Sequence, residues 1–202
     1  MPERQMSEQS LIGAFEAPPQ DAARAFRAAL EALARPGTIH EIKGGKAPAP
    51  ISEAAASLLL TLCDPETPLC LMGAHDTPAI RDWIAFQIGA PIVGPAKAMF
   101  ALGTWAALQP VTAFPIGTAE YPDRSTTLIV EMERLSQDGM RLTGPGIETT
   151  ASLTLPALEP FQMNAALFPL GLDFYFTSGT QIAGLPRSTK VSPETGAEME
   201  AD

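Results

Sequence analysis

The densest group of chemically versatile side chains lies in the segment GTAEYPDRSTT, residues 117–127, which joins two apolar runs. Within it, Glu120 and Arg124 carry charge and Ser125 carries a hydroxyl. Loops held on a rigid scaffold are where binding residues concentrate, so this segment is a candidate binding loop. The alternative is a solvated turn, because its Pro-Asp pair is favourable turn chemistry.

Two further arginines stand in turn-forming sequences, Arg35 in RPGTIH and Arg187 in LPRST. The planar guanidinium group binds tetrahedral oxyanions and carboxylates through paired hydrogen bonds. We therefore predict that Arg35, Arg124 and Arg187 converge on one anion-binding pocket, with Glu120 as a further substrate-binding residue. Neighbouring hydroxyl groups that would add neutral donors belong to Ser125, Ser188 and Thr189. The alternatives are that Arg35 complements the dipole at a helix end and that each arginine forms a surface ion pair with a carboxylate.

The remaining reactive residues form no self-contained catalytic motif. The two cysteines lie in apolar runs that are typical of buried thiols. The two histidines stand apart, so the cysteines and histidines do not have the spacing of zinc ligands. The glycine-rich GPGI lacks the spacing of a phosphate-binding or dinucleotide-binding loop. No lysine lies in a sequence context that suits a Schiff base. We expect no metal, no cofactor and no catalysis by the chain alone.

The first half of the chain alternates helices and strands. A helix is predicted over 21–34, with Asp21 as N-cap and with Phe26, Leu30 and Leu33 as its buried stripe. Ser52 begins a second helix that ends before the Asp-Pro pair at 64–65. A third helix begins at Thr77-Pro78 and is capped by Gly89. The strands predicted between these helices are 38–42, 68–73 and 98–102.

The second half is dominated by hairpins. A strand over 126–135 is expected to pair with 140–144 across the turn 137–139. A strand at 151–155 and a helix over 157–168 follow, and a second hairpin joins 172–179 to 181–186. These patterns predict an α/β fold with a mixed sheet sandwiched by helices.

Chain length, net charge and hydropathy limit the number of domains and the classes of partner. A chain of 202 residues predicts one domain, here 14–191, between a flexible N-terminus at 1–13 and an acidic flexible tail at 192–202. A net charge of −10 repels phosphate backbones, so we expect no nucleic-acid partner. No apolar stretch is long enough to span a membrane and the first residues lack a signal-peptide core, which predicts a cytoplasmic protein.

Several segments, taken in order, resemble a known family. They are FEAPPQDAARAFRAALEALARPGTIHEI, SLLLTLCDPETPLCL, GTAEYPDRSTTLIVEMERL, LTGPGI, FPLGLDFYFTSG and LPRSTKV, and together they span residues 14–191. Their order and spacing are similar to the H subunits of bacterial carbon–phosphorus lyase, the PhnH family. The terminal motif departs from the usual Pro-Arg-Thr-Thr by a serine at Ser188, which keeps the hydroxyl.

The resemblance implies more than the residues do. It implies a subunit that works in alkylphosphonate breakdown with subunits G, I and J. It also implies support for the formation of α-D-ribose 1-methylphosphonate 5-triphosphate from ATP and methylphosphonate, with release of adenine. The implied fold is that of pyridoxal-phosphate-dependent transferases without the cofactor, and the implied state of the isolated chain is a homodimer. Two alternatives stay open: an independent small-molecule enzyme that uses Glu120, Arg124 and Arg187, and a plain scaffold module that binds an anion.

Overall fold

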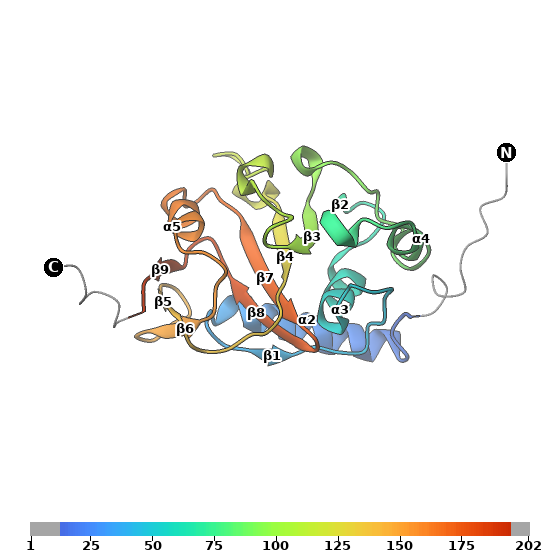
Figure 1. The fold of residues 1–202 in the computed structure, drawn as a ribbon, viewed down its shortest axis with the longest axis horizontal. Helices are drawn as coiled ribbons and strands as arrows, with labels where there is room; N and C mark the ends of the chain where they lie inside the picture. Colours follow the sequence, from blue (N-terminus) through green and yellow to red (C-terminus); the bar gives the residue numbers. More distant parts are fainter. Residues whose placement is uncertain (1–12, 195–202) are drawn as a thin grey trace.

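The computed structural model describes residues 13–194, which form two β-sheets covered by helices (Figure 1). The helices are α2 (Pro18–Ala34), α3 (Glu53–Leu62), α4 (Pro78–Gln87) and α5 (Glu159–Ala166). The larger sheet contains β1 (His40–Glu41), β2 (Leu69–Leu71), β3 (Phe100–Thr104), β4 (Thr127–Glu131), β7 (Asp173–Ser178) and β8 (Gln181–Leu185). The smaller sheet contains β5 (Met140–Thr143), β6 (Ala151–Leu153) and β9 (Lys190–Ser192).

The larger sheet is mixed, which confirms the predicted α/β class. Its strand order is β1-β8-β7-β4-β3-β2. The neighbours from β2 to β7 are parallel, whereas β8 and β1 add to the edge in antiparallel fashion. The predicted second hairpin is confirmed, because β7 and β8 pair directly across a tight turn. In contrast, the predicted strand at 38–42 is reduced to two residues at the sheet edge.

Two predicted helix starts are confirmed in detail. The Ser52 hydroxyl accepts the Ala55 N–H at 3.1 Å, and the Thr77 hydroxyl accepts the Ile80 N–H at 3.3 Å. These bonds satisfy backbone donors that have no partner within the first turn of a helix. Capping residues in the sequence therefore fixed where α3 and α4 begin.

The prediction for α2 is wrong at its N-cap and for two of the three residues of its apolar stripe. The helix begins at Pro18, and Asp21 instead accepts the Ala17 N–H from inside the first turn. The side chains of Phe26 and Leu30 are 53% and 56% exposed. The buried face is made of small residues: Ala25, Ala29 and Ala32.

A close approach of α2 to the sheet explains this choice of face. A Cβ atom placed on Gly184 of β8 would lie 2.6 Å from the backbone of Ala32. The Tyr175 hydroxyl also donates to the Ala29 carbonyl at 3.2 Å. At this distance only small side chains fit between helix and strand, because protein interiors are close-packed. Phe26 and Leu30 therefore face outward, whereas Leu33 is partly buried and packs against the core as predicted.

The hairpin predicted between 126–135 and 140–144 is also wrong. β4 lies between β3 and β7 in the larger sheet, whereas β5 pairs with β6 and β9 in the smaller one. Leu128, Ile129 and Val130 are all fully buried. A central strand that is covered on both faces is apolar on both faces and needs no alternation with polar residues. The local pattern therefore predicted that 126–135 contains a strand, but it did not show which strands lie beside it.

The two faces of the larger sheet carry separate cores. One core joins the sheet to α2, α3 and α4, and the other joins it to α5 and the smaller sheet. In the second core, the ring of Phe161 from α5 lies edge-on to Phe174 with 5.1 Å between the ring centroids. Figure 1 shows α5 and the smaller sheet gathered at one end of the molecule, away from α3 and α4.

The ends of the predicted domain lie close to the limits of the described residues. Trp83 donates its indole N–H to the Gly13 carbonyl at 3.1 Å, and β9 extends to Ser192. The flexible ends predicted at 1–13 and 192–202 lie almost wholly outside the described residues, and the domain limits stay a prediction. Across residues 13–194, no helix is long and apolar enough to cross a membrane.

A buried histidine follows β2. His75 lies in the short helix Gly73–His75 after β2 and is 2% exposed. Neither of its ring nitrogens has a hydrogen-bond partner within residues 13–194. Burial lowers the pKa of His75 below its ordinary value of 6.5, because the imidazolium form would have to lose its hydration.

The free energy of unfolding should therefore depend on pH through His75. Because the unfolded chain protonates near pH 6.5 while the folded chain resists protonation, stability is complete above pH 6.5 and falls as the pH drops below it. The slope from this group is at most about 1.4 kcal/mol per pH unit. Urea unfolding of the wild type and of His75→Leu between pH 5 and 8 should show their stability difference changing below pH 6.5. A difference that stays constant across this range would contradict the assignment.

Candidate functional site

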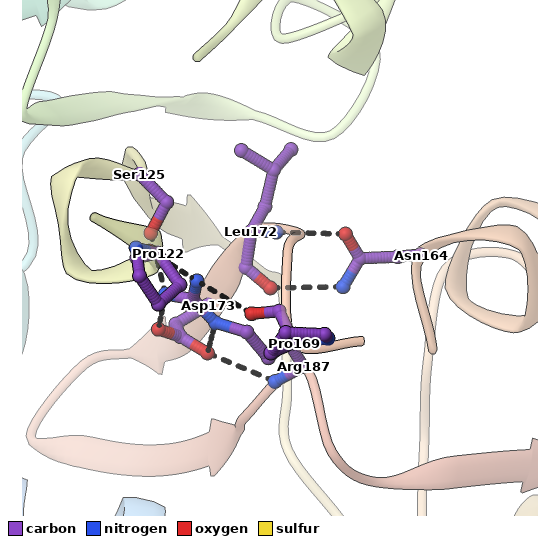
Figure 2. A network of polar contacts seen from close by, with 7 residues as sticks. All are labelled: Pro122, Ser125, Asn164, Pro169, Leu172, Asp173 and Arg187. Carbon is purple, nitrogen blue, oxygen red and sulfur yellow. Dashed lines mark hydrogen bonds and ion pairs between the residues drawn. The ribbon is translucent and has the colours of Figure 1, made fainter. Parts of the chain in front are cut away.

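The Arg187 guanidinium is the centre of the polar network in Figure 2. Its Nε and Nη2 atoms donate to the two carboxylate oxygens of Asp173, at 3.2 and 2.5 Å. Nη1 donates to the Pro122 carbonyl at 2.6 Å and to the Pro169 carbonyl at 3.5 Å. Nη2 also donates to the Ser125 hydroxyl. Because arginine has five N–H groups, these bonds use its whole donor capacity.

The fold brings these partners together at the end of the larger sheet where the parallel strands β4 and β7 begin. Asp173 is the first residue of β7 and pairs with Thr127, the first residue of β4. The segment that carries Ser125 therefore ends beside Asp173. Arg187 follows β8, and its backbone N–H also donates to Asp173, at 2.8 Å. The ion pair is largely shielded from solvent, with side-chain exposures of 13% for Arg187 and 21% for Asp173.

A second contact fixes the segment that leads into β7. The Asn164 amide group of α5 donates to the Leu172 carbonyl and accepts the Leu172 N–H, both at 2.8 Å. Figure 2 shows the two bonds side by side. A Cβ atom on Gly171, whose φ is +125°, would lie 2.9 Å from the Asn164 oxygen. This close approach requires glycine before Leu172.

The loop predicted to bind substrate lies against Arg187. Arg187 contacts both ends of the short helix Pro122–Arg124 through Pro122 and Ser125. Arg124 itself is exposed, and its guanidinium lies 4.0 Å from the centroid of the Tyr121 ring. Glu120 is also exposed. The structure thus brings Arg187 and the Arg124 loop together, and it leaves the Arg124 side chain open to solvent.

Arg35 takes part in a different contact. At the end of α2 it pairs with Glu31 at 3.3 Å, and its side chain is 67% exposed. The neighbouring Ala34 carbonyl lies against Gly146 of the GPGI turn. Nothing among the described contacts joins Arg35 to Arg124 or Arg187. Convergence of all three arginines on one pocket stays a prediction.

The three hydroxyl groups expected near the arginines differ in their surroundings. Ser125 is buried and accepts from Arg187. Thr189 is also buried, but its hydroxyl has no partner within residues 13–194. The Ser188 carbonyl lies beside Gly144, where an added Cβ would be 3.0 Å away. Only the Ser125 hydroxyl therefore belongs to the network around Arg187.

A partly buried carboxylate at the opposite ends of strands β4 and β7 was not predicted. Glu131, the last residue of β4, accepts the Ser52 N–H at 2.7 Å and the Thr177 hydroxyl at 3.0 Å. Burial raises the pKa of Glu131, and the hydrogen bonds from Ser52 and Thr177 oppose the shift. These bonds tie the start of α3 to the carboxyl ends of β4 and β7. In open α/β sheets that edge is the usual place for a ligand.

Sequence reasoning selected Arg187 but missed its main partner. Asp173 stands alone among apolar residues in LGLDFYF, and a carboxylate at the head of a buried strand requires a partner. That signal was available in the sequence. Asn164 gave no such signal, because asparagine is equally common on exposed helix surfaces.

Residues that hold metals or cofactors are sparse in the described part of the chain. No group of three or more His, Cys, Asp or Glu side chains is placed to bind a metal ion within residues 13–194. Every lysine is exposed: Lys43, Lys46, Lys97 and Lys190. A Schiff-base lysine is activated by desolvation or by a neighbouring cation, and the exposed lysines lack the first of these conditions.

The partly buried ion pair between Arg187 and Asp173 should be far more sensitive to substitution than an exposed one. Asp173→Asn keeps the shape of the side chain but leaves the guanidinium without a counter-charge. We expect a loss of about 2–3 kcal/mol in the free energy of unfolding, slightly below the cost of breaking a fully buried pair. Glu31→Gln, which breaks the exposed pair with Arg35, is the matched control and should cost less than about 1 kcal/mol. Equal effects in chemical denaturation would show that the Asp173 pair is not a structural centre.

Comparison with known proteins is consistent with the segments noted in the sequence. The family model described as bacterial phosphonate metabolism protein (PhnH) matches residues 13–192. The chain is 40% identical to the alpha-D-ribose 1-methylphosphonate 5-triphosphate synthase subunit PhnH of Rhizobium meliloti (strain 1021), over 94% of this chain and 100% of that protein. It is 28% identical to HtxG of Stutzerimonas stutzeri, provisionally named a C-P lyase subunit protein, over 88% of each chain. This chain therefore belongs to the PhnH family of bacterial phosphonate metabolism proteins.

Proposed function

We propose that this chain is a subunit of a carbon–phosphorus lyase complex and supports the synthesis of α-D-ribose 1-methylphosphonate 5-triphosphate. The observation that carries the proposal is similarity along the whole length of the R. meliloti synthase subunit, at 40% identity. The second relative is also named after a subunit of C-P lyase. The reaction would join methylphosphonate to the ribose of ATP and release adenine.

The geometry favours a supporting role over catalysis by this chain alone. Arg187 donates all of its N–H groups to protein acceptors, which leaves none for a substrate. Glu131, the partly buried carboxylate with a raised pKa, is held by the backbone of Ser52 and the hydroxyl of Thr177. Perturbed groups of this kind mark active sites in many enzymes, but here the hydrogen bonds join elements of the fold.

Arg124 is the residue through which the candidate loop would act. Arg187 positions the loop, and Arg124 and Glu120 face solvent, where a partner subunit or an anionic group would reach them. The loop lies at the amino ends of β4 and β7. Arg35 would join this site only if the assembled complex brings it close. In this role Arg187 is a positioning residue rather than a direct ligand.

The partners of the proposed complex are the G, I and J subunits, in the cytoplasm. In their absence we propose that the chain forms a homodimer through the outer face of α2. Phe26 and Leu30 are exposed one helical turn apart on this face. Exposed apolar patches of this kind mark interaction surfaces. We also propose the fold of pyridoxal-phosphate-dependent transferases without the cofactor, in line with the exposure of every lysine.

Reconstitution tests the proposed function. Purified partner subunits with ATP and methylphosphonate should release adenine at least ten times faster when this chain is present. The chain alone should release none. Arg124→Ala should reduce the stimulation while leaving the unfolding midpoint unchanged, because Arg124 is exposed. An equal rate with and without the chain would contradict the proposal, and turnover by the isolated chain would favour the independent enzyme.

Sedimentation tests the proposed dimer. The wild type should sediment at twice its 21.3 kDa mass at micromolar concentration. The double variant Phe26→Glu/Leu30→Glu should sediment as a monomer, because it places charge on the apolar face of α2. Phe86→Glu, on the exposed face of α4, is the matched control and should remain a dimer. A wild-type monomer, or a double variant that still dimerises, would contradict this interface.

A further inference from the structure

An apolar cleft lies beside the Arg187 network and shares with Figure 2 only Asn164 and Leu172. Its volume is about 350 Å³, which leaves room for a few side chains. It lies between α5 and the segment 109–116 that follows β3. The apolar residues of its wall are Pro110, Val111, Ile116, Pro160, Met163, Leu167 and Leu172.

The polar groups of this wall are few and mostly engaged. The Asn164 amide both donates to and accepts from the backbone of Leu172. The Gln109 amide donates to the Trp105 carbonyl at 3.2 Å. Sites for small metabolites need a few polar groups that converge on the ligand. This cleft offers none that is both buried and free, so its walls suit an apolar side chain better than a polar metabolite.

The one charge on the wall is negative. Glu159, in the first turn of α5, lines the cleft and forms no ion pair within residues 13–194. The lining contains neither lysine nor arginine. The whole chain carries a net charge of −10. A phosphate-bearing ligand would therefore be repelled here, whereas a segment with a basic residue would be attracted.

The rim of the cleft is apolar surface left open to solvent. Met163 is 59% exposed and Leu167 is 45% exposed, and the neighbouring Phe168 is 61% exposed. Methionine adapts its shape to a partner more readily than branched side chains do. Exposed apolar groups gathered around a concavity are an arrangement that marks protein interaction sites.

We propose that this cleft docks a segment of another polypeptide in the complex, one that inserts an apolar side chain beside Met163 and Leu167 and places a lysine or arginine against Glu159. The partner is thus a basic, apolar segment and not a second copy of this acidic chain. The inference rests on the proposed function, because it takes the partner to be another subunit of the same complex. It adds which surface binds and what chemistry the partner presents.

Copurification with the partner subunits from coexpression tests the cleft. The full-length wild type is compared with Met163→Glu, with Glu159→Gln and with Phe86→Glu as a matched control on α4, whose core lies on the other face of the sheet. Met163→Glu should weaken binding at least tenfold, because it places a charge on the apolar wall. Glu159→Gln should weaken it about threefold at low salt and make it less dependent on salt. Phe86→Glu should bind like the wild type.

The outcomes separate the cleft from the proposed function. If the wild type binds and Met163→Glu binds equally well, the cleft is not the docking surface, although the proposed function stands. If the wild type does not bind any partner subunit, the proposed function fails and the cleft assignment falls with it. If Met163→Glu instead turns a wild-type dimer into a monomer, the occupant is a second copy and the proposal is wrong. Circular dichroism and unfolding midpoints equal to the wild type confirm that the variants fold.

Discussion

The ion pair between Arg187 and Asp173, largely shielded from solvent, is the constraint on which the candidate site depends. A guanidinium that is removed from water must find acceptors for each of its N–H groups, because an unpaired buried charge is costly. Here the acceptors come from two separate segments, residues 122–125 before β4 and residues 169–173 that lead into β7. Satisfying one side chain therefore fixes the relative positions of segments that are far apart in the sequence.

The same ion pair gives Arg187 and Arg124 different roles. Because Arg187 is saturated by protein acceptors, it cannot act as a ligand without breaking the network that holds the loop. Arg124, on the adjacent turn, contacts the Tyr121 ring and remains open to solvent. A fixed loop with one free cation is a suitable contact for a partner or an anionic group. This arrangement agrees with a subunit that contributes a surface to a complex rather than a complete active site.

The sequence predicted local structure better than it predicted partners. The starts of α3 and α4 were predictable because Ser52 and Thr77 satisfy backbone donors within their own first turns. The buried face of α2 was not, because its alanines are selected by the backbone of β8 through Gly184, more than 150 residues later. The partner of β4 was missed for the same reason. Strand pairing between β4 and β7 is decided by burial on both faces of the sheet, and a nearby turn signal carries no information about it.

In the candidate site, too, the sequence indicated the local character of a segment better than it indicated the contacts between segments. The residue types of the loop at 117–127 and of Arg187 identified a polar region, and the structure places these two segments in contact. The role of Arg187 was not predictable, because a buried arginine and a ligand-binding arginine have the same local sequence. Asp173 distinguishes the two, and its contact with Arg187 depends on the register of β7 with β4 and β8.

Amide hydrogen exchange tests the central claim, that Arg187 holds the loop in place. The backbone N–H groups of Tyr121 and Arg124 are bonded only within the loop, to Thr118 and Tyr121. In Arg187→Lys, which keeps the charge but loses the fork of donors, these amides should exchange at least ten times faster than in the wild type. The amides of Ile129 and Val130 in β4 should accelerate only as far as the global free energy of unfolding falls, which denaturation of the same variant measures. Unchanged exchange at Tyr121 and Arg124 would contradict the account, because it would mean that the loop keeps its structure without Arg187.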